Sequence, residues 1–413
     1  MSEWSIKKQL SFVDLKSLCI SIIDCPHSTP NWTDEGIVVI RNFNIKSGQL
    51  SLEKKSYTDK KTYLERTKRA IPESGDLVIT REAPMGEVCM IPPNLTCCLG
   101  QRIVLLKVDK TKVLSRYVLL ALQSSYVQKQ IEQFNKTGSI VSNLNLSSLK
   151  QLKIPMVDNQ EEVSYLFASI NKKIELNNRI NAELEAMAKT LYDYWFVQFD
   201  FPDEHGKPYK SSGGKMVYNE TLKRDIPEGW EDQILGNIAN ITMGLSPSGK
   251  SLNNDRNGTI FYQGSTDFGW LYPAIRQYTT QTTRIAKQDD LLLSVRAPVG
   301  EINIASHECC IGRGVAAMNE KNGYNNFLLY VMKDFKKVFA NRNSEGTTFG
   351  SITKSDLHSL PIAYPKIETI KLYESMTSPI RKKMLTLYKE NQELTELRDW
   401  LLPMLMNGQV TVN

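Results

Sequence analysis

Apolar residues recur along the chain at two spacings, one typical of strands and one typical of helices. Short apolar runs at Ile37–Ile40, Leu77–Thr80 and Ile103–Val108 lie between segments rich in Gly, Pro and Asn, and they predict strands. Residues 113–135 and 324–340 carry apolar side chains at helical spacing, and each segment predicts one helix. The pattern therefore predicts mixed α/β (α+β) structure.

Two longer segments, about 160–196 and 368–405, show the alternating three- and four-residue spacing of a coiled-coil seam. At 1.5 Å per residue, each helix would be roughly 50 Å long. Asn181 and Asn391 align in the two segments, and a polar seam residue lowers stability but specifies register and partner. The alternative is that each helix packs on its own domain, although neither shows the wide apolar face typical of such helices. The predicted seam includes Ile170, Ile174, Asn181, Leu184, Leu191, Ile380, Met384, Asn391, Leu394 and Leu401.

The chain repeats itself in the segments that precede these helices. "GDLVITREAPMGEV" at Gly75–Val88 and "DDLLLSVRAPVGEI" at Asp289–Ile302 share six identical residues of fourteen. "CCLGQRI" at Cys97–Ile103 and "CCIGRGV" at Cys309–Val315 follow in the same order. A weaker match starts at Thr137 and again at Glu345. Two copies of about 200 residues predict a duplicated module with pseudo-twofold symmetry.

The repeat predicts five parts in the chain. These are a first globular domain (1–158), a first long helix (159–200), a surface linker rich in Gly, Pro, Ser and Lys (201–229), a second globular domain (230–365) and a second long helix (366–413). Inside the repeated turn, the paired Pro and Gly suit a tight turn between strands. The arginine of the turn, however, stands at different positions in the two copies: Arg81 aligns with Val295, and Glu82 aligns with Arg296. Because only the turn-forming residues are shared, we interpret the turn as a structural element of the module.

Composition narrows the class of protein. A chain of 413 residues with 41% apolar residues can form two or more globular domains. It has no run of 18 apolar residues, and its N-terminus lacks a signal-peptide pattern, so we expect a cytoplasmic protein without a membrane span. Seven cysteines without C-x-x-C spacing predict buried, reduced thiols in place of disulfides or zinc ligands.

Charge is concentrated near the N-terminus. The net charge of the whole chain is only +6, but residues 1–155 hold 22 Lys and Arg against 14 Asp and Glu. This excess permits a polyanionic partner without requiring one.

Motifs of common enzymes that act on DNA are missing from the sequence. We find no glycine-rich cofactor loop with an N/D-P-P-Y/F-like loop, no G-x-x-x-x-G-K-S/T, no PD…ExK array on a strand, no clustered histidines and no G-x-S-x-G. The sequence therefore favours a binding protein over an enzyme. Two modules joined by paired helices suit the reading of two places on DNA at a fixed separation.

Several segments resemble the specificity (S) subunit of type I restriction–modification enzymes. "IIDCPHSTPNW" (Ile22–Trp32) and "IPEGWEDQILGNIANITMGLSPSGKS" (Ile226–Ser251) resemble the openings of two target-recognition domains. "LYDYWFVQFDFPDEHGKPYKSSGGKMVYNETLKRDIPEGW" resembles the central conserved region of the family, and it is the most specific signal. "LSSLKQLKIP" and the final "LLPMLMNGQV" complete a resemblance that covers essentially the whole chain.

The resemblance implies a non-catalytic subunit that binds double-stranded DNA. Each recognition domain would read one half of a bipartite, asymmetric site in the major groove. The two helices would pair antiparallel, set the gap and dock two adenine methyltransferase (M) subunits. Motor-nuclease (R) subunits would join them. The chain itself would hold no cofactor or metal, with S-adenosylmethionine, ATP and Mg on the partners.

Direct readout needs side chains that reach base edges, and phosphate contacts need cations and hydroxyls. In the first domain we expect DNA contacts from loop residues and a basic stretch: Ser28, Thr29, Arg41, Asn42, Lys54, Lys55, Lys60, Lys61, Lys68, Arg69, Arg81, Gln101, Arg102 and Ser139. In the second domain we expect them from Ser246, Ser248, Lys250, Gln263, Ser265, Thr266, Arg284, Arg296, Arg313, Thr347 and Thr348. Trp270 and Tyr272 could pack on a thymine methyl group, although packing within the protein suits Trp270 better.

Other interpretations stay open at this stage. A single loop lysine is more often a solvated surface charge than a DNA contact. Arg296 could pair with Glu301 or Asp290 and hold the turn, and a structural role is equally open for Arg313. The whole chain could instead be a stand-alone DNA-binding regulator, or a methyltransferase or nuclease with an unrecognised site.

Overall fold

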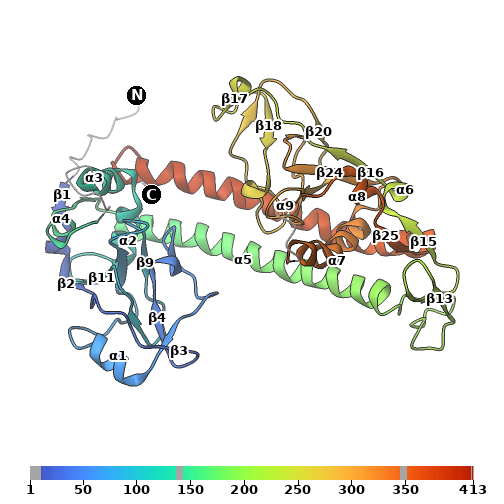
Figure 1. The fold of residues 1–413 in the computed structure, drawn as a ribbon. Coiled ribbons are helices and arrows are strands. Elements are labelled where there is room, and N and C mark those ends of the chain that lie inside the picture. The colour runs from blue at the N-terminus through green and yellow to red at the C-terminus, as the bar shows by residue number, and fades with distance from the viewer. Residues whose placement is uncertain (1–10, 136–142, 345–350, 411, 413) are drawn as a thin grey trace. The chain divides into compact units, whose positions relative to one another are not determined.

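The computed structural model describes residues 11–135, 143–344, 351–410 and 412 (Figure 1). The chain divides into two compact units. The first contains residues up to Glu175 together with Gln392–Asn413, and the second contains Leu176–Asn391. Both units combine helices with small, mostly antiparallel sheets, as the mixed α/β prediction required. Each unit has its own apolar cores.

The first unit is built around two four-stranded sheets. The first sheet is entirely antiparallel, and its order is β2 (Cys19–Asp24), β11 (Ile103–Val108), β8 (Leu77–Thr80) and β9 (Val88–Met90). In the second, β10 (Cys97–Leu99) runs parallel to β4 (Ile37–Ile40), and β7 (Tyr57–Thr58) and β3 (Trp32–Thr33) follow. Two further pairs are β1 (Ser11–Asp14) with β12 (Lys153–Met156) and β5 (Ile45–Lys46) with β6 (Gln49–Leu50). The three strands predicted from apolar runs are β4, β8 and β11, with the predicted bounds.

Helices pack against both sheets of this unit. They are α1 (Lys60–Arg66), α2 (Ser115–Gln123), α3 (Ser125–Asn135), α4 (Leu146–Lys150), the 3-10 turns η1 (Leu15–Leu18) and η2 (Asn42–Asn44), and the first part of α5 (Gln160–Tyr192). Leu405 and Met406, at the end of α9 (Ile367–Met406), join the same core as Phe167 of α5. Figure 1 shows α1 and β3 at the end of the domain that is remote from α5.

The helix predicted at 113–135 is wrong in one respect, because the structure divides it into α2 and α3 at Ser124. Ser124 has an extended backbone, with φ −62° and ψ 146°. Its buried hydroxyl donates to Ala121 O at 2.6 Å and accepts from the Val127 N–H at 3.4 Å. The side chain thus caps the second helix where it turns away from the first.

The second unit repeats the strand order of the first. Its antiparallel sheet runs β16 (Ala239–Met243), β24 (Val315–Glu320), β21 (Leu291–Ser294) and β22 (Ile302–Ile304). Its second sheet runs β17 (Leu252–Asn253), β19 (Tyr278–Thr279), β18 (Thr259–Tyr262), β23 (Cys309–Ile311) and β20 (Ile285–Ala286), with β18 parallel to β23. β15 (Glu231–Ile234) pairs with β25 (Pro361–Tyr364) as β1 pairs with β12. The repeat in the sequence is therefore a repeat in topology.

The helices of the second unit include one that matches its prediction closely. They are α6 (Leu235–Ile238), α7 (Asn325–Ser344), α8 (Lys354–His358), the 3-10 turns η4 (Gly249–Ser251) and η5 (Ser265–Asp267), most of α9 and the end of α5. α7 corresponds to the helix predicted at 324–340. α5 ends in a π-helical turn, η3 (Asp193–Val197), whose Trp195 and Phe196 are buried in the core.

The segment predicted as a surface linker is largely ordered structure in this unit. It contains the hairpin of β13 (Met216–Asn219) and β14 (Arg224–Pro227). The Phe201 ring stacks on Tyr209 at 4.8 Å and on Trp230 at 5.3 Å between centroids. Polar composition indicated a loop, but the aromatic residues at its ends anchor it to the core.

Candidate nucleic-acid interface

In the first domain, loops that follow β2, β4, β8 and β10 meet in one cluster, which we call the first loop cluster (residues 26–29, 41–44, 81–87 and 100–102). Gln101 Nε2 donates to His27 O and lies 3.4 Å from Thr29 Oγ1. Asn42 Nδ2 donates to Glu82 O at 3.1 Å, and the Arg102 guanidinium pairs with the Glu82 carboxylate at 3.0 Å. The strand ends therefore bring together five residues predicted from separate parts of the sequence: Ser28, Thr29, Asn42, Gln101 and Arg102.

Arg41 of this cluster lies between two exposed aromatic rings. Its guanidinium carbon is 4.9 Å from the Trp32 ring centroid and 4.7 Å from that of Phe43. Trp32 and Phe43 are 43% and 47% exposed, and Lys54 Nζ lies 5.7 Å from the Phe43 ring. Cation–π stacking of this kind orients a guanidinium while leaving its edge free to bind an anion or a base.

Arg81 is held within the protein, unlike the other predicted arginines of this domain. Its side chain is 11% exposed, and its guanidinium pairs with Asp24 at 2.7 Å. It also donates to Leu144 O at 2.9 Å and to Asn143 Oδ1 at 3.1 Å. All three nitrogens are thus engaged, so this geometry favours a structural role in holding the loop before α4 against the repeated turn.

Arg66, which the sequence did not single out, positions the first loop cluster. It is 7% exposed and donates to Leu99 O at 2.8 Å, Ser28 O at 2.8 Å and Pro26 O at 3.0 Å. Burial of a charged group is costly unless it is fully hydrogen-bonded, and here three backbone carbonyls satisfy it. Its only signal in the sequence was its place at the end of an amphipathic segment, which does not distinguish it from surface arginines.

The predicted basic stretch lies at the surface of the same domain. Lys54 and Lys55 precede β7, Lys60 and Lys61 begin α1, and Lys68 and Arg69 follow it; all six are exposed. The Asp59 carboxylate caps α1 by accepting from the Thr62 N–H at 2.7 Å. The helix therefore presents its lysines in a fixed arrangement.

The second domain forms an equivalent second loop cluster (residues 244–248, 263–267, 295–300 and 312–314). Ser246 Oγ lies 3.0 Å from Gln263 Oε1 and accepts from the Arg313 N–H at 3.2 Å. The Gly314 N–H donates to Gln263 O at 3.1 Å. Thr266 O accepts from Arg276, whose guanidinium also pairs with Asp267. Predicted residues Ser246, Gln263, Ser265, Thr266 and Arg313 therefore lie on neighbouring loops.

Four further cations or hydroxyls predicted in this domain are exposed: Ser248, Lys250, Arg284 and Arg296. The backbone of Arg296 bridges that of Ser351, and Glu301 pairs with Lys336 at 2.8 Å. Trp270 is 60% exposed, whereas Tyr272 is 4% exposed and its ring packs on Tyr388 at 4.7 Å between centroids. The suggestion that Tyr272 packs on a thymine is therefore wrong, because the core covers its ring. Ser139, Thr347 and Thr348 lie outside the described residues.

The repeated turn has the same hydrogen bonds in both domains. Thr80 and Ser294 are fully buried, and their hydroxyls donate to Pro84 O and Pro298 O respectively. The same hydroxyls accept from the N–H groups of the glutamates at 87 and 301, at 3.0 and 3.3 Å. Both turns contain a cis Ala-Pro bond and a glycine at φ +87°, a conformation that favours glycine.

The predicted seam residues face the interior along both long helices. Ile170, Asn181 and Met384 are buried, and Ile174, Leu184, Leu191, Ile380, Asn391, Leu394 and Leu401 are half-buried. In the second unit, Asn177 Nδ2 donates to Asn391 Oδ1 and Glu390 Oε2, both at 2.9 Å. Asn391 Nδ2 donates to Asn178 Oδ1 at 2.8 Å. Tyr373 OH donates to Ala188 O at 3.2 Å, so the two helices run antiparallel there.

Burial raises the pKa values of cysteine thiols in both domains. All seven cysteines are free and buried, and burial raises the pKa of the Cys19, Cys89, Cys97 and Cys309 thiols to about 12. Among the described residues, no three His, Cys, Asp or Glu side chains gather in a group that could hold a metal ion. None of the helices in the described part of the chain is long and apolar enough to cross a membrane.

Comparison with known proteins identifies the repeated module. A family model described as the type I restriction modification DNA specificity domain matches residues 10–186 and again 227–396. The MjaX specificity subunit of Methanocaldococcus jannaschii, assigned to a type I restriction enzyme, is 31% identical over 82% of this chain and 79% of its own length. The type I restriction enzyme MjaIX specificity subunit of the same organism is 23% identical over 85% of this chain and 81% of its own. The crystal structure of a type I restriction-modification S subunit from M. genitalium shares the fold, with a TM-score of 0.59, 16% identity and 97% of each chain covered. The chain therefore belongs to the DNA specificity subunits of type I restriction-modification systems, the non-catalytic components that recognise DNA.

Proposed function

We propose that each of the two domains reads one half of a bipartite, asymmetric DNA site in the major groove, through its loop cluster. The observation that carries this proposal is the contrast within the duplicated module. The same strands end in both domains, but the loops that follow them carry different polar side chains. Because hydrogen-bonding side chains read base edges, different side chains on one scaffold would read different sequences.

In the first domain, the first loop cluster would face base edges and the exposed basic stretch would bind phosphates. Ser28, Thr29, Arg41, Asn42, Gln101 and Arg102 are the candidates for the bases; Arg81 is a weaker one because its guanidinium is engaged. In the second domain the candidates are Ser246, Gln263, Ser265, Thr266, Arg284, Arg296 and Arg313, with Ser248 and Lys250 beside them.

The long helices would set the gap between half-sites and dock two methyltransferase subunits, which motor-nuclease subunits would join. In the second unit, apolar side chains are exposed on the helices outside the seam: Met187 is 60% exposed, and Leu372 and Met376 are 46% and 47% exposed. Exposed apolar side chains on a paired helix are typical of a surface that another protein covers. S-adenosylmethionine, ATP and Mg would be bound by these partners.

The predicted domain boundaries, at 158, 200, 229 and 365, remain part of this proposal. The two compact units divide the chain differently, because each long helix contributes one end to either unit.

The decisive experiment maps methylated adenines in DNA exposed to the assembled enzyme. With the wild-type chain, we expect methylation of one split motif with a constant gap. The double variant Gln101→Ala/Arg102→Ala should relax or abolish recognition of one half of the motif, by about 1–3 kcal/mol per lost base contact. Gln263→Ala/Arg313→Ala should affect only the other half.

Lys16→Ala, an exposed lysine in η1 outside both clusters, serves as the matched control and should leave the motif unchanged. Methylation by the purified chain alone would favour a self-contained enzyme. DNA binding with no partner retained in a pull-down would favour a stand-alone regulator. Loss of both half-sites from either double variant would contradict the assignment of one half to each domain.

A further inference from the structure

A glutamate fills the space beside the helix that follows the first sheet of the second domain. Glu374 lies on α9 and accepts from Asn326 Nδ2 at 2.7 Å. The N–H groups of Asn326 and Phe327, in the first turn of α7, point at the same carboxylate at 3.4 Å. The positive end of a helix attracts an anion, so this carboxylate joins α7 to α9 within the chain.

The first domain has the same helices but lacks this carboxylate. The seam alignment that pairs Asn181 with Asn391 places Ser164 of α5 at the position of Glu374. Ser115 lies in the first turn of α2, as Asn326 does in α7. Both serines are more than nine-tenths buried, and neither hydroxyl has a hydrogen-bond partner in the structure. A buried hydroxyl without a hydrogen-bond partner lowers the stability of the fold. A bound group that hydrogen-bonds to it would remove this cost.

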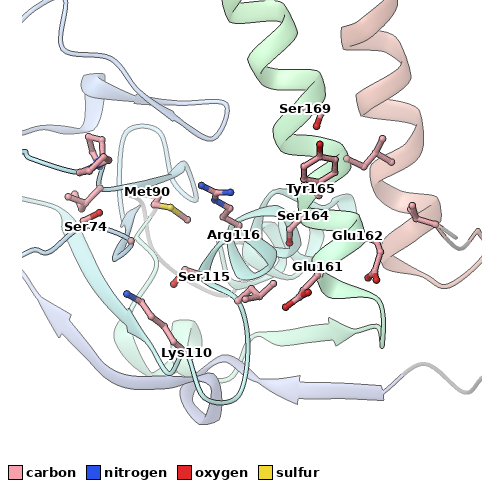
Figure 2. A pocket seen from close by; sticks show the side chains of 17 residues that line it. Ser74, Met90, Lys110, Ser115, Arg116, Glu161, Glu162, Ser164, Tyr165 and Ser169 are labelled. Atoms are coloured by element: carbon pink, nitrogen blue, oxygen red, sulfur yellow. The ribbon is translucent and has the colours of Figure 1, made fainter.

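Ser115 and Ser164 are among the residues that line the large cavity shown in Figure 2. Its volume is about 1290 Å³, whereas the cavity beside Glu374 in the second domain measures about 390 Å³. The walls are formed by the turn before β8, the segment after β9, the start of α2 with the residues before it, and the first three turns of α5, together with Val412. Apolar side chains make up much of the lining: Met90, Ile91, Pro92, Pro93, Leu114 and Leu166.

The charges around the cavity suit a single carboxylate. α2 has nine residues, no side chain hydrogen-bonded at its N-cap and no acidic residue in its first turn, and the first N–H groups of a helix have no partner within the helix. Arg116 and Lys110 line the cavity on this side, and Glu161 and Glu162 line it from α5 (Figure 2). The two glutamates would repel a polyanion such as the DNA backbone. The apolar walls and the exposed ring of Tyr165 favour a protein segment.

We propose that this cavity receives a glutamate or aspartate side chain from a methyltransferase subunit, held by Ser115, Ser164, Arg116 and the start of α2. The partner's carboxylate would occupy in trans the place that Glu374 occupies within the chain in the second domain. This inference rests on the proposed docking of methyltransferase subunits. It adds that the two domains engage their partners differently, because only the first has an acceptor site for an acidic residue.

The proposal is tested with the variant Ser164→Glu of the full-length protein, which places a carboxylate of the chain itself in the cavity. We expect the free chain to unfold at a higher temperature, by about 2–4 °C for about 1 kcal/mol, because the new side chain caps α2. We expect its affinity for the purified methyltransferase subunit to fall about tenfold or more, since the site is already filled. Arg116→Gln should lower the same affinity without the gain in stability. Ser51→Glu, at an exposed serine of the same domain outside any helix, is the matched control and should change neither quantity.

Titration calorimetry or sedimentation with the methyltransferase subunit gives the affinities. If the wild-type chain binds the subunit and both Ser164→Glu and Arg116→Gln bind it equally well, the cavity proposal is overturned and the docking function stands. If the wild-type chain does not bind the subunit at all, the cavity proposal and the proposed docking function both fail. Zero-length carbodiimide coupling in the wild-type complex adds a direct measurement: Lys110 should cross-link to a partner carboxylate, and coupling only to carboxylates of its own chain contradicts the proposal.

Discussion

The first and second domains share a backbone plan but differ in what their loops and helix ends hold. In both, the order of the four-stranded antiparallel sheet, the parallel strand pair of the second sheet and the Ala-Pro turn are the same. Between β7 and β8 the first domain inserts α1, which brings Arg66 under the loop cluster. In the second domain, residues 280–290 separate β19 from β21 and contain the short strand β20 in place of a helix. Duplication therefore preserved the scaffold, while the parts that would face a ligand diverged.

The helix ends differ in the same way. The second domain satisfies the start of α7 with its own glutamate, and the first leaves two buried hydroxyls at the start of α2. One site is complete within the chain and the other is open. A duplicated module can thus present two unlike surfaces, and variants in each copy test that contrast.

The largest effect is expected for Arg66→Ala, which removes the residue specific to the first domain. Three backbone carbonyls lose a charged donor, and we expect the unfolding free energy to fall by about 3 kcal/mol or more. Denaturant unfolding measures this loss. Recognition should fail for one half-site and persist for the other. Arg69→Ala, at an exposed neighbouring position, should stay within about 0.5 kcal/mol of wild type. A loss confined to Arg69→Ala would contradict this assignment.

A smaller effect, equal in the two domains, is expected for the repeated turn. Thr80→Val and Ser294→Ala each remove a buried hydroxyl that donates to one backbone group and accepts from another. We expect each to lower the unfolding free energy by about 1–2 kcal/mol and to leave the methylated motif unchanged. Thr29→Val removes an exposed hydroxyl in the first loop cluster. It should leave the unfolding free energy unchanged and alter the methylated motif. A change of motif in either turn variant would show that the turn reads DNA.

The smallest effect concerns the thiols, which both domains bury. Because burial raises the pKa of Cys89, Cys97 and Cys309 to about 12, these thiols stay protonated at pH 8. We expect a thiol reagent to label them slowly in the folded chain and all seven rapidly in denaturant. An unfolded thiol titrates near pH 8.5, so their contribution to stability is full below that pH and declines as the pH rises towards 12. Rapid labelling of the folded chain would place these cysteines at the surface.

The regular elements could be predicted well because they depend on local spacing. The runs at β4, β8 and β11 and the seams of α5 and α9 need only a periodicity of apolar residues. The break at Ser124 could not be predicted, since the apolar pattern continues across it and the hydroxyl that stops α2 gives no periodic signal. The hairpin at 216–227 was hidden for a similar reason: its composition is that of a loop, and aromatic residues at its ends hold it in place.

The candidate site was predictable in kind but not residue by residue. Loops after strands were expected to carry the polar groups, and the structure brings Gln101, Thr29 and Asn42 into one cluster. The sequence could not distinguish Arg81, bound to Asp24 and Leu144, from the exposed Arg102. Tyr272 was misplaced for the same reason, because its neighbour Tyr388 lies 116 residues away in the chain.

The duplication, the longer strands and helices and the family resemblance could be predicted from the amino-acid sequence alone. Each depends on residues that are close together or that recur in order. Which charged side chains are exposed, and which helix start has a carboxylate of its own chain, became clear only from the folded structure. Those outcomes depend on carbonyls, rings and carboxylates that folding brings together from distant parts of the chain, as with Arg66 at Ser28 and Glu374 at Asn326.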